Sequence, residues 1–323
     1  MSNGRKPIFR LPVEFYTFIV LICLLAVFSV ASNYRFLSYE NLRALGRLLP
    51  DLGIVSLGIA MLMIAGEFDL SISSQIPLCS FIMIQLLKLG LGELPSFFVT
   101  LGVGAVLGLI NAMITIKGRI PSFITTLGTM LLWRGLVLLL TLGYQKPLVG
   151  VSDLLKNALI SSIFGVPVQI VWFAGIALIL GFILHRHKFG NWIYATGDNE
   201  AAARAMGVNT TLTKTICFMI VGTLCGLASI MQVLRVGSFF SRAGDGWELK
   251  AVAAAVLGGA SLRGGIGSIP GAVLGALAII LIENAITTLR IDYFWTYIVE
   301  GAIIVLYTLM TTSVQRLRGI RSS

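Results

Sequence analysis

The feature that most constrains the fold of this chain is a succession of long apolar segments. The longer ones reach the ~20 residues that a tilted membrane helix needs. Of 323 residues, 57% are hydrophobic and 12% are charged, against roughly 45–50% and about 25% in soluble domains. We therefore predict an all-α integral membrane protein with about ten transmembrane helices. The apolar segments are 13–32, 51–66, 76–90, 96–116, 121–142, 168–184, 211–233, 249–260, 270–289 and 296–314.

Three of these segments, 51–66, 76–90 and 249–260, are too brief to cross a bilayer straight. Such segments are typical of broken or re-entrant helices that line a polar region inside the protein. The first apolar segment follows a basic stretch and lacks a small-x-small cleavage site, so we interpret it as a span and not as a cleavable signal. The distribution of Lys and Arg favours both termini in the cytoplasm. We expect one transmembrane domain, 1–323, with cytoplasmic tails at 1–12 and 315–323 and a cytoplasmic loop at 185–212.

The residue types of most enzymes and metal sites are absent or badly spaced. No Ser-His-Asp set, HExxH, GxSxG or GxxxxGK[ST] motif can be assembled, so we expect neither catalysis nor ATP binding by this chain. The formal charge of +10 is explained by basic tails beside anionic lipid headgroups, without nucleic acid. We expect no metal site, with the cysteines as small buried hydrophobes and the histidines solvated. These residues are Cys23, Cys79, Cys217, Cys225, His185 and His187.

Glycine has two predicted uses. Pairs at four-residue spacing make faces on which helices approach closely: 104 with 108, 222 with 226, and 271 with 275. The stretch "AVLGGASLRGGIGSIPGAVLG" surrounds Arg263 with glycines between two apolar segments. A tight connection is the simpler reading of this stretch, since a phosphate-binding loop would need a spacing that it lacks.

One polar stretch, "GDNEAAARAMGVNTTLTK" at 197–214, stands out from its apolar surroundings. Asn199, or Asp198 beside it, can cap a helix in which Glu200 precedes Arg204 by four residues. Gly207 suits the left-handed position that ends such a helix. A helix of ~10 Å is too short to be stable alone, so we expect it to need tertiary support or a cytosolic partner.

Several motifs in the sequence resemble those of a known protein family. "NEAAARAMGV", followed after about fifty residues by "AVAAAVLGGASLRGGIGSIPGAVLGAL", resembles the permease subunits of bacterial ABC importers for ribose, xylose and other simple sugars. "AGEFDLSISS" at 65–74 and "IPSFITTLGTMLLWRGL" at 120–136 are similar to that family's "GIDLSVGS" and "FIxTLGxxxxxRG" patterns. In the first pattern, Glu67 and Phe68 stand where the family usually has Gly-Ile.

The resemblance implies a permease in the bacterial inner membrane that translocates a simple sugar or related polyol. Its partners would be a second permease copy or paralogue, a periplasmic solute-binding protein and a cytosolic ABC ATPase, which would hold the ATP and Mg. The short polar helix would transmit ATPase motion to the spans. The coupling residues that follow from this are Asn199, Glu200, Ala201, Ala202, Ala203, Arg204 and Gly207.

Polar residues within or beside the spans are the candidates for the substrate pathway. A carboxylate at membrane depth is costly enough to suggest a function, although Glu283 and Glu300 could instead snorkel to a headgroup. Arg134 could likewise snorkel, and the asparagines could join helices. The pathway candidates are Glu67, Asp69, Ser71, Asn111, Arg134, Glu283 and Asn284.

Four arginines on the predicted outer side form the candidate docking surface for the binding protein. In "NLRALGRLL", leucines and arginines fall on different helical faces, which suits a helix lying at the outer interface. Headgroup contact is the alternative explanation of these cations. The four are Arg43, Arg47, Arg235 and Arg242.

Other classes of protein remain open from the sequence. An ion-coupled secondary transporter would use Glu67, Asp69 or Glu283 as carriers, but would not need a cytosolic docking helix. An ABC permease for a branched-chain amino acid, a nucleoside or autoinducer-2 would share the motifs. A scaffolding membrane protein is disfavoured by the polar residues inside spans.

Overall fold

The computed structural model describes residues 13–292 together with 294–296, 298–299, 301–302 and 305. This part of the chain is almost wholly helical, with two pairs of two-residue antiparallel strands. The helices are α1 (Val13–Ala31), η1 (Arg35–Leu37), α2 (Tyr39–Ile64), α3 (Ile72–Lys88), α4 (Glu93–Gly118), α5 (Ser122–Thr141), α6 (Asp153–Ile160), α7 (Val168–Arg186), α8 (Lys188–Asp198), α9 (Glu200–Ala205), α10 (Thr210–Val236), α11 (Trp247–Leu257) and α12 (Ile269–Thr288). The strand pairs are β1 (Lys146–Pro147) with β4 (Ser238–Phe239) and β2 (Ser162–Ile163) with β3 (Val166–Pro167).

Seven of these helices, α1, α2, α4, α5, α7, α10 and α12, are long and apolar enough to cross a membrane. The predicted segments 76–90 and 249–260 correspond to the shorter helices α3 and α11, of 17 and 11 residues. These findings confirm an all-α membrane protein with short helices inside its core. The tenth predicted segment, 296–314, lies mostly outside the described residues, as do Glu300 and the tails at 1–12 and 315–323.

The prediction for residues 41–66 was wrong. We expected an interfacial helix and a separate short span, whereas both belong to the 26-residue helix α2. This helix continues through Pro50, whose ring is buried against neighbouring elements. Proline is tolerated inside a membrane helix when surrounding protein compensates for the lost backbone hydrogen bond. The helix therefore continues through Pro50 because of the packing around it, and the local sequence does not reveal that packing.

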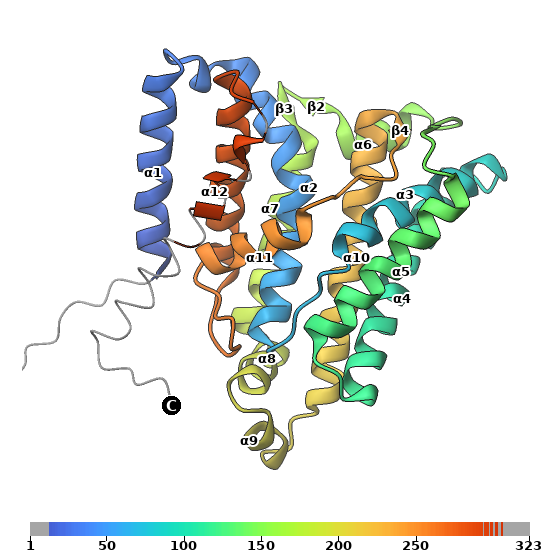
Figure 1. The fold of residues 1–323 in the computed structure, drawn as a ribbon, viewed down its shortest axis with the longest axis vertical. Coiled ribbons are helices and arrows are strands. Elements are labelled where there is room, and N and C mark those ends of the chain that lie inside the picture. Colours follow the sequence, from blue (N-terminus) through green and yellow to red (C-terminus); the bar gives the residue numbers. More distant parts are fainter. Residues whose placement is uncertain (1–12, 293, 297, 300, 303–304, 306–323) are drawn as a thin grey trace, which may run out of the picture.

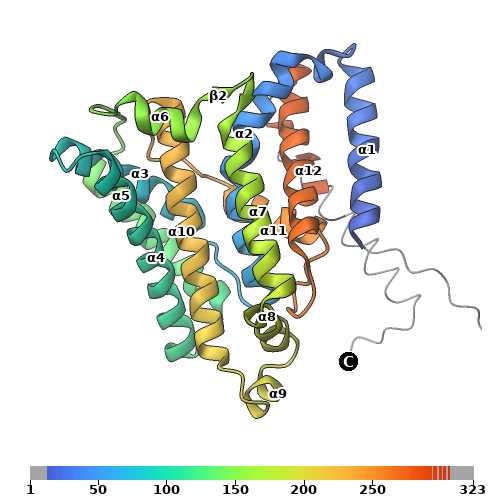
Figure 2. The same cartoon turned by 180° about the vertical axis from the view of Figure 1, so that it is seen from behind.

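The helices stand side by side and define two ends of the molecule (Figures 1 and 2). α1 lies at one edge beside α12, and α4 and α5 lie towards the opposite edge, with α2 and α10 between them. We call the end that carries α8 and α9 the α9 end. The opposite end, which carries η1, α6 and β2, is called the far end. The α2–α3 connection, the start of α10 and the α11–α12 connection all lie towards the α9 end.

The paired glycines are used for close packing, as predicted. A Cβ atom added to Gly104 of α4 would lie 2.1 Å from the Gly222 carbonyl oxygen of α10, and one added to Gly222 would lie 2.0 Å from the Gly104 oxygen. A Cβ added to Gly271 of α12 would lie 2.0 Å from the Gly258 oxygen. No larger residue fits without separating these backbones, so glycine sets the distance between the helices.

The cysteines are packed as predicted with one exception. Cys79, Cys217 and Cys225 are buried, whereas Cys23 lies on the exposed surface of α1. α1 stands at the edge of the helix array, so one of its faces has no protein neighbour among the described residues (Figure 1). An apolar thiol is compatible with such a face in a membrane helix.

Candidate coupling and transport sites

The polar helix predicted at the coupling loop exists as α9, Glu200–Ala205. The Asn199 side chain caps it, since its Oδ1 accepts a hydrogen bond of 3.0 Å from the Ala202 backbone N–H. Gly207 has a φ of +84° just after the helix, which is the left-handed region expected there. A second helix that sequence reasoning missed, α8, fills the first part of the predicted loop and is N-capped by His187 Nδ1.

One face of α9 is available to a partner. Ala201 and Ala202 are exposed, and the side chain of Met206 beyond them is 85% exposed. Ala203 points inward and is 4% exposed. α9 protrudes at its end of the molecule, beyond the ends of the long helices (Figure 1). The helix thus presents small side chains on the outside while its inner face is held by the protein.

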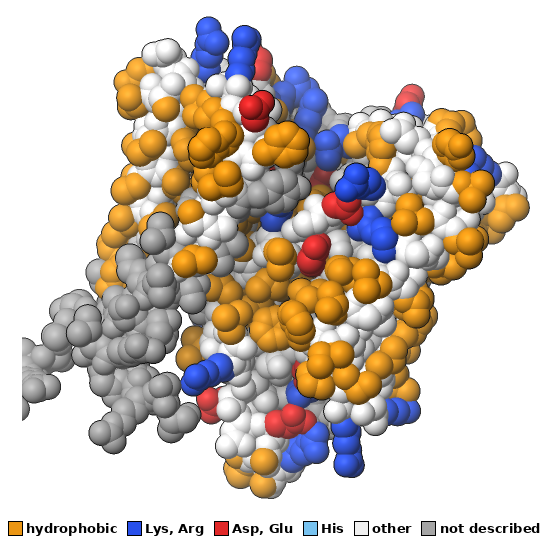
Figure 3. Space-filling view, in the orientation of Figure 1, with side chains coloured by type: hydrophobic (Ala, Val, Ile, Leu, Met, Phe, Trp, Pro, Cys, Tyr) orange, Lys and Arg blue, Asp and Glu red, His pale blue; other side chains and the backbone are white. Residues whose placement is uncertain are grey.

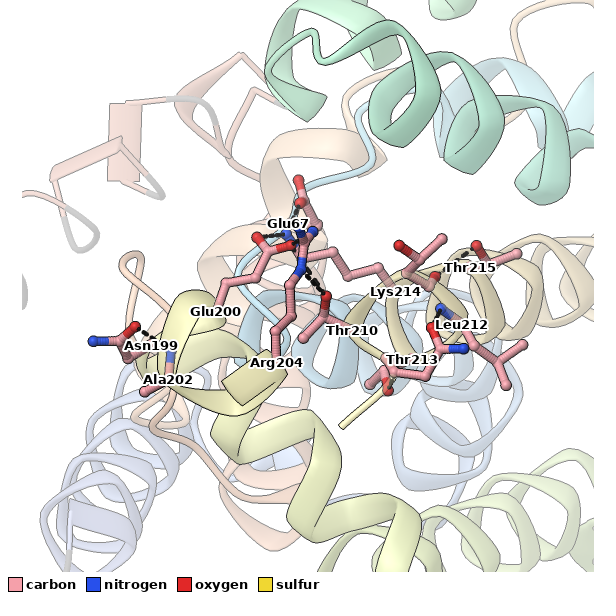
Figure 4. A network of polar contacts seen from close by, with 12 residues as sticks. Glu67, Asn199, Glu200, Ala202, Arg204, Thr210, Leu212, Thr213, Lys214 and Thr215 are labelled. Carbon is pink, nitrogen blue, oxygen red and sulfur yellow. Dashed lines mark hydrogen bonds and ion pairs between the residues drawn. The ribbon is translucent and has the colours of Figure 1, made fainter. Parts of the chain in front are cut away.

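An ion-pair network attaches α9 to the transmembrane helices (Figure 4). Lys214 Nζ, in the first turns of α10, lies 2.7 Å from Glu200 Oε2 and 2.6 Å from Glu67 Oε1. Glu200 also pairs with Arg204, and Arg204 Nε donates a hydrogen bond of 2.7 Å to Thr210 Oγ1. Glu67 belongs to the α2–α3 connection. The network therefore joins α9, α10 and that connection through the buried Lys214 and Glu67 and the half-buried Glu200, with Arg204 at its exposed edge.

The environment of Glu200 favours its ionised form. Partial burial opposes ionisation, but hydrogen bonds from Lys214 and Thr210 and the charges of Lys214 and Arg204 outweigh it. Together they hold the pKa of the Glu200 carboxyl below its ordinary value. The charge of Glu200 therefore stabilises the attachment of α9.

Three backbone segments meet without side chains between them beside this network. A Cβ added to Gly197, at the end of α8, would lie 1.8 Å from the Ile64 carbonyl oxygen of α2 and 2.7 Å from the Gly265 nitrogen. The Gly265 N–H donates a hydrogen bond of 2.9 Å to the same Ile64 oxygen. A Cβ added to Gly264 would lie 2.9 Å from Gly66 Cα. The glycine-rich stretch is thus a tight connection that packs on the ends of α2 and α8.

Asp69 is the centre of a buried polar cluster that also contains predicted pathway residues. Its carboxylate accepts hydrogen bonds from the Ser71 N–H at 2.9 Å, Ser71 Oγ at 2.6 Å, Gln75 Nε2 at 3.1 Å and Asn111 Nδ2 at 3.1 Å. Asp69, Ser71, Gln75 and Asn111 are all fully buried. In the same connection, the Phe68 N–H donates a hydrogen bond to Ser122 Oγ of α5. The Leu70 N–H donates one to Thr126 Oγ1 of the same helix. The cluster fixes the α2–α3 connection to α4 and α5.

Arg134 lies apart from that cluster and does not reach towards a headgroup. Its Nη2 donates a hydrogen bond of 2.8 Å to the Ser73 carbonyl oxygen and lies 2.6 Å from Asp245 Oδ1. Its Nη1 donates to the Ser241 carbonyl oxygen. Arg134 therefore links α5 to the beginning of α3 and to the connection between β4 and α11.

Glu283 and Asn284 are partnered within the helix array. Glu283 of α12 forms an ion pair with the buried Lys250 of α11, so Glu283 does not stand as a free carboxylate. Asn284 exchanges two side-chain hydrogen bonds with Asn41, at 2.9 and 3.0 Å. These contacts connect α12 to α11 and to the start of α2.

The four arginines of the predicted docking surface have different environments. Arg235 pairs with the buried Asp51 at 2.5 Å, so the expectation that it is a free surface cation was wrong. Arg43 and Arg47 are half-buried, and Arg43 Nη2 donates a hydrogen bond of 3.1 Å to Ser162 Oγ. The side chain of Arg242 is 87% exposed and pairs with Asp245 at 3.0 Å. Arg235 is fixed because a buried carboxylate needs a cationic partner.

Sequence reasoning missed several charged residues that complete these sites. Asp51 and Lys250 each stand inside or beside a strongly apolar segment, where an ionisable side chain is a signal of function or pairing. Asp245 and Lys214 lie next to predicted elements, and no spacing in the sequence indicates which residues they pair with. The opposite charges could be noticed in the sequence, but their pairing could not.

A membrane-spanning helix array with short helices in its core and a capped polar helix at one end is the architecture of a transport permease. The match to a family model covers residues 42–308, and that family is described as the branched-chain amino acid transport system / permease component. The ribose import permease protein RbsC of Escherichia coli (strain K12) is 33% identical over 306 residues, which are 94% of this chain and 95% of that protein. The autoinducer 2 import system permease protein LsrC of Salmonella paratyphi B is 33% identical over 287 residues, or 88% of this chain and 82% of that protein.

The chain therefore belongs to the family of ABC-importer permease subunits, as its motifs predicted. No solved structure matches it.

Proposed function

We propose that this protein is the permease subunit of an ABC importer that moves a simple sugar or related polyol across the bacterial inner membrane. The observation that carries the proposal is the attachment of α9: its outer face is bare and its inner face is paired through Lys214 to the α2–α3 connection. A partner that pushes or pulls on α9 would thus act on the helices that surround Asp69. The similarity to the ribose and autoinducer 2 permeases supports a hydroxyl-rich solute.

The energy source in this proposal is a separate cytosolic ATPase, which holds the ATP and Mg and docks on α9. The α9 end is then cytoplasmic, and both termini lie on that side of the membrane. Asn199 and Gly207 delimit the docking helix, Ala201 and Ala202 form its contact face, and the inward Ala203 anchors it. The chain itself then carries out no catalysis, and a second copy or a paralogue completes the transport path.

We assign different roles to the pathway candidates. Asp69, Ser71 and Asn111 keep the α2–α3 connection in place, and Arg134 faces the polar region at the beginning of α3. Glu67 is joined to α9 and would pass motion from the docking helix to Asp69, two residues away. Glu283 and Asn284 support this region through α11 and α2 and are further from the solute.

The periplasmic solute-binding protein docks at the far end in this proposal. Arg242, Arg43 and Arg47 form the basic surface that meets its acidic patches, because complementary charge raises the rate of docking and fixes its register. Arg235 contributes less, since its guanidinium is already paired with Asp51.

Import by the reconstituted complex tests the function. The chain, its ATPase and its binding protein are placed in proteoliposomes, and import of labelled D-ribose and leucine is followed with each partner or ATP omitted in turn. We expect import of the sugar that requires all three proteins and ATP. Import driven by an ion gradient without the ATPase would instead establish a secondary transporter. Import of leucine but not of a sugar would agree with the family's description as branched-chain amino acid permeases and would overturn the sugar assignment.

A further inference from the structure

Two adjoining hollows lie where the β4–α11 connection runs beside α3 and α5. The first has a volume of about 390 Å³ and includes Gln232 and Trp247 in its wall. The second has a volume of about 300 Å³ and includes Ser74, Arg134 and Glu248. Asp245 lines both, so the hollows share a wall. Their volumes are at the lower end of the roughly 300–1,000 Å³ that small-molecule sites occupy.

These hollows lie within the depth of the helix array. Arg134 stands 12 residues after the first residue of the 20-residue helix α5, or ~18 Å along its axis. The short helices α3 and α11 both begin beside it, with Ser73 bonded to Arg134 and Trp247 as the first residue of α11. Acidic and basic side chains gather on this face of the molecule, between α3, α11 and β4 (Figure 3). Interrupted helices of this kind meet solutes inside transport proteins.

Several residues in the walls of these hollows carry a buried polar atom that has no hydrogen-bond partner among the residues that the structure describes. These atoms are Gln232 Oε1 beside the first hollow, and Ser74 Oγ and Glu248 Oε2 beside the second. A buried polar atom without a partner is costly, so these atoms leave hydrogen-bonding capacity unused beside the hollows. Two of the three, Gln232 Oε1 and Glu248 Oε2, can only accept hydrogen bonds, which is the capacity that the O–H groups of a solute would need.

The two arginines of the site are already paired within the protein, whereas Glu248 Oε2 has no partner among the described residues. Arg134 and Arg242 both pair with Asp245, so neither guanidinium stands ready for the carboxylate of an amino acid. Trp247 adds an apolar ring to the wall beside Gln232. A solute that suits this combination is uncharged, carries several hydroxyls and presents an apolar face.

We propose that the double hollow formed by Gln232, Ser74, Glu248, Asp245 and Trp247 binds a neutral polyhydroxylated solute during its passage through this chain. Gln232 and Glu248 accept hydrogen bonds from its hydroxyls, Trp247 contacts its apolar face, and Asp245 orients the arginines. This inference rests on the proposed transport function and names the residues that would set its solute class.

The experiment uses the reconstituted transporter with its ATPase and binding protein. The probe is a defined mixture of neutral pentoses and hexoses that includes D-ribose, and leucine is the competitor of a different class. Gln232→Leu and Glu248→Gln each remove an acceptor without changing the size of the side chain much. We expect each to lower import of the sugar at low concentration about tenfold, through a raised KM. ATP hydrolysis stimulated by the binding protein should change less than about twofold.

Gln169→Leu is the matched control, because Gln169 of α7 is buried and its amide likewise has no partner among the described residues, yet it lines neither hollow. This variant should import like the parent. Parental import by both Gln232→Leu and Glu248→Gln would overturn the binding site and leave the transport function intact. A parent complex that imports no sugar from the mixture contradicts the proposed function itself. Inhibition of sugar import by leucine would contradict the neutral solute class.

Discussion

Lys214 Nζ lies 2.6 Å from Glu67 Oε1 and 2.7 Å from Glu200 Oε2, so one ammonium group joins the α2–α3 connection to α9. The side chains of Lys214 and Glu67 are 11% and 12% exposed, which protects their pairing from solvent screening. In the proposed coupling, motion of α9 would pass through this ammonium group to the residues that hold Asp69.

Glu67→Gln should weaken this transmission without unfolding the protein. Lys214 keeps Glu200 as a partner, so we expect a loss of about 1–2 kcal/mol in stability and not the larger cost of an unpaired buried charge. ATP hydrolysis by the complex should continue while the amount of solute imported per ATP falls. Glu93→Gln makes the same chemical change at the far end, where Glu93 accepts from Ser152, and should leave that ratio unaltered. A parental ratio in Glu67→Gln would remove this residue from coupling.

Ala202→Trp should block approach of the ATPase to α9. Ala202 is exposed, so the indole can be accommodated by the fold, but it covers the bare face. We expect stimulated ATP hydrolysis to be lost, with the thermal stability of the isolated permease and the docking of the binding protein both retained. Ala203→Trp provides the contrast, because Ala203 is 4% exposed and its replacement should lower stability as well. Normal stimulated hydrolysis in Ala202→Trp would show that the ATPase docks elsewhere.

Gly104→Ala should destabilise the protein far more than Gly102→Ala in the same helix. The added methyl at residue 104 would lie 2.1 Å from the Gly222 carbonyl oxygen, whereas that at residue 102 meets nothing within 4 Å. Overpacking of this kind costs about 1–3 kcal/mol or more, and a helical Gly→Ala change in open space is neutral or slightly stabilising. Thermal unfolding in detergent measures both. Equal melting temperatures for the two variants would contradict the close contact of α4 with α10.

The attachment of α9 should loosen in acid. The pKa of Glu200 is held below the ordinary value of a glutamate carboxyl, so the folded state favours the ionised carboxyl. Its stabilising contribution is complete above the ordinary pKa and is lost as the pH falls through the lower folded-state value. Hydrogen-exchange protection of the α9 amides should therefore be complete above the ordinary carboxyl pKa and fall as the pH drops below it. Glu200→Gln should show weak protection at every pH. Parental protection in that variant would contradict the role of the Glu200 charge.

Arg43→Glu combined with Arg242→Glu should slow association of the binding protein several-fold at low salt and much less at high salt. Exposed charges are screened over ~8–10 Å at ionic strengths near 0.1–0.15 M. Arg235 is not used in this test, because a carboxylate at that position would face the buried Asp51 and disturb folding. Arg263→Glu reverses an exposed charge at the α9 end and serves as the control. Association kinetics like those of the parent at low salt would assign Arg43 and Arg242 to the membrane surface.

The sequence by itself determined the membrane class, most of the long helices and the polar helix with its caps. Apolar segment length reports what can be buried in lipid, and Asn199, Glu200, Arg204 and Gly207 form a cap and an i,i+4 pair that depend only on neighbours within one or two turns. The paired glycines at four-residue spacing were likewise visible, because a helix places them on one face.

Only the tertiary structure decided which charges meet. Glu67 and Lys214 are separated by 147 positions, Asp51 and Arg235 by 184, and no local spacing relates them. The structure also continued α2 through Pro50 and brought Asp245 beside Arg134. A charge within an apolar segment requires a partner because burial without one is too costly, but the partner is chosen by which helices pack together. The pairing of charges therefore depends on the packing of the whole helix array, whereas helix caps and apolar segments depend on residues within a single segment.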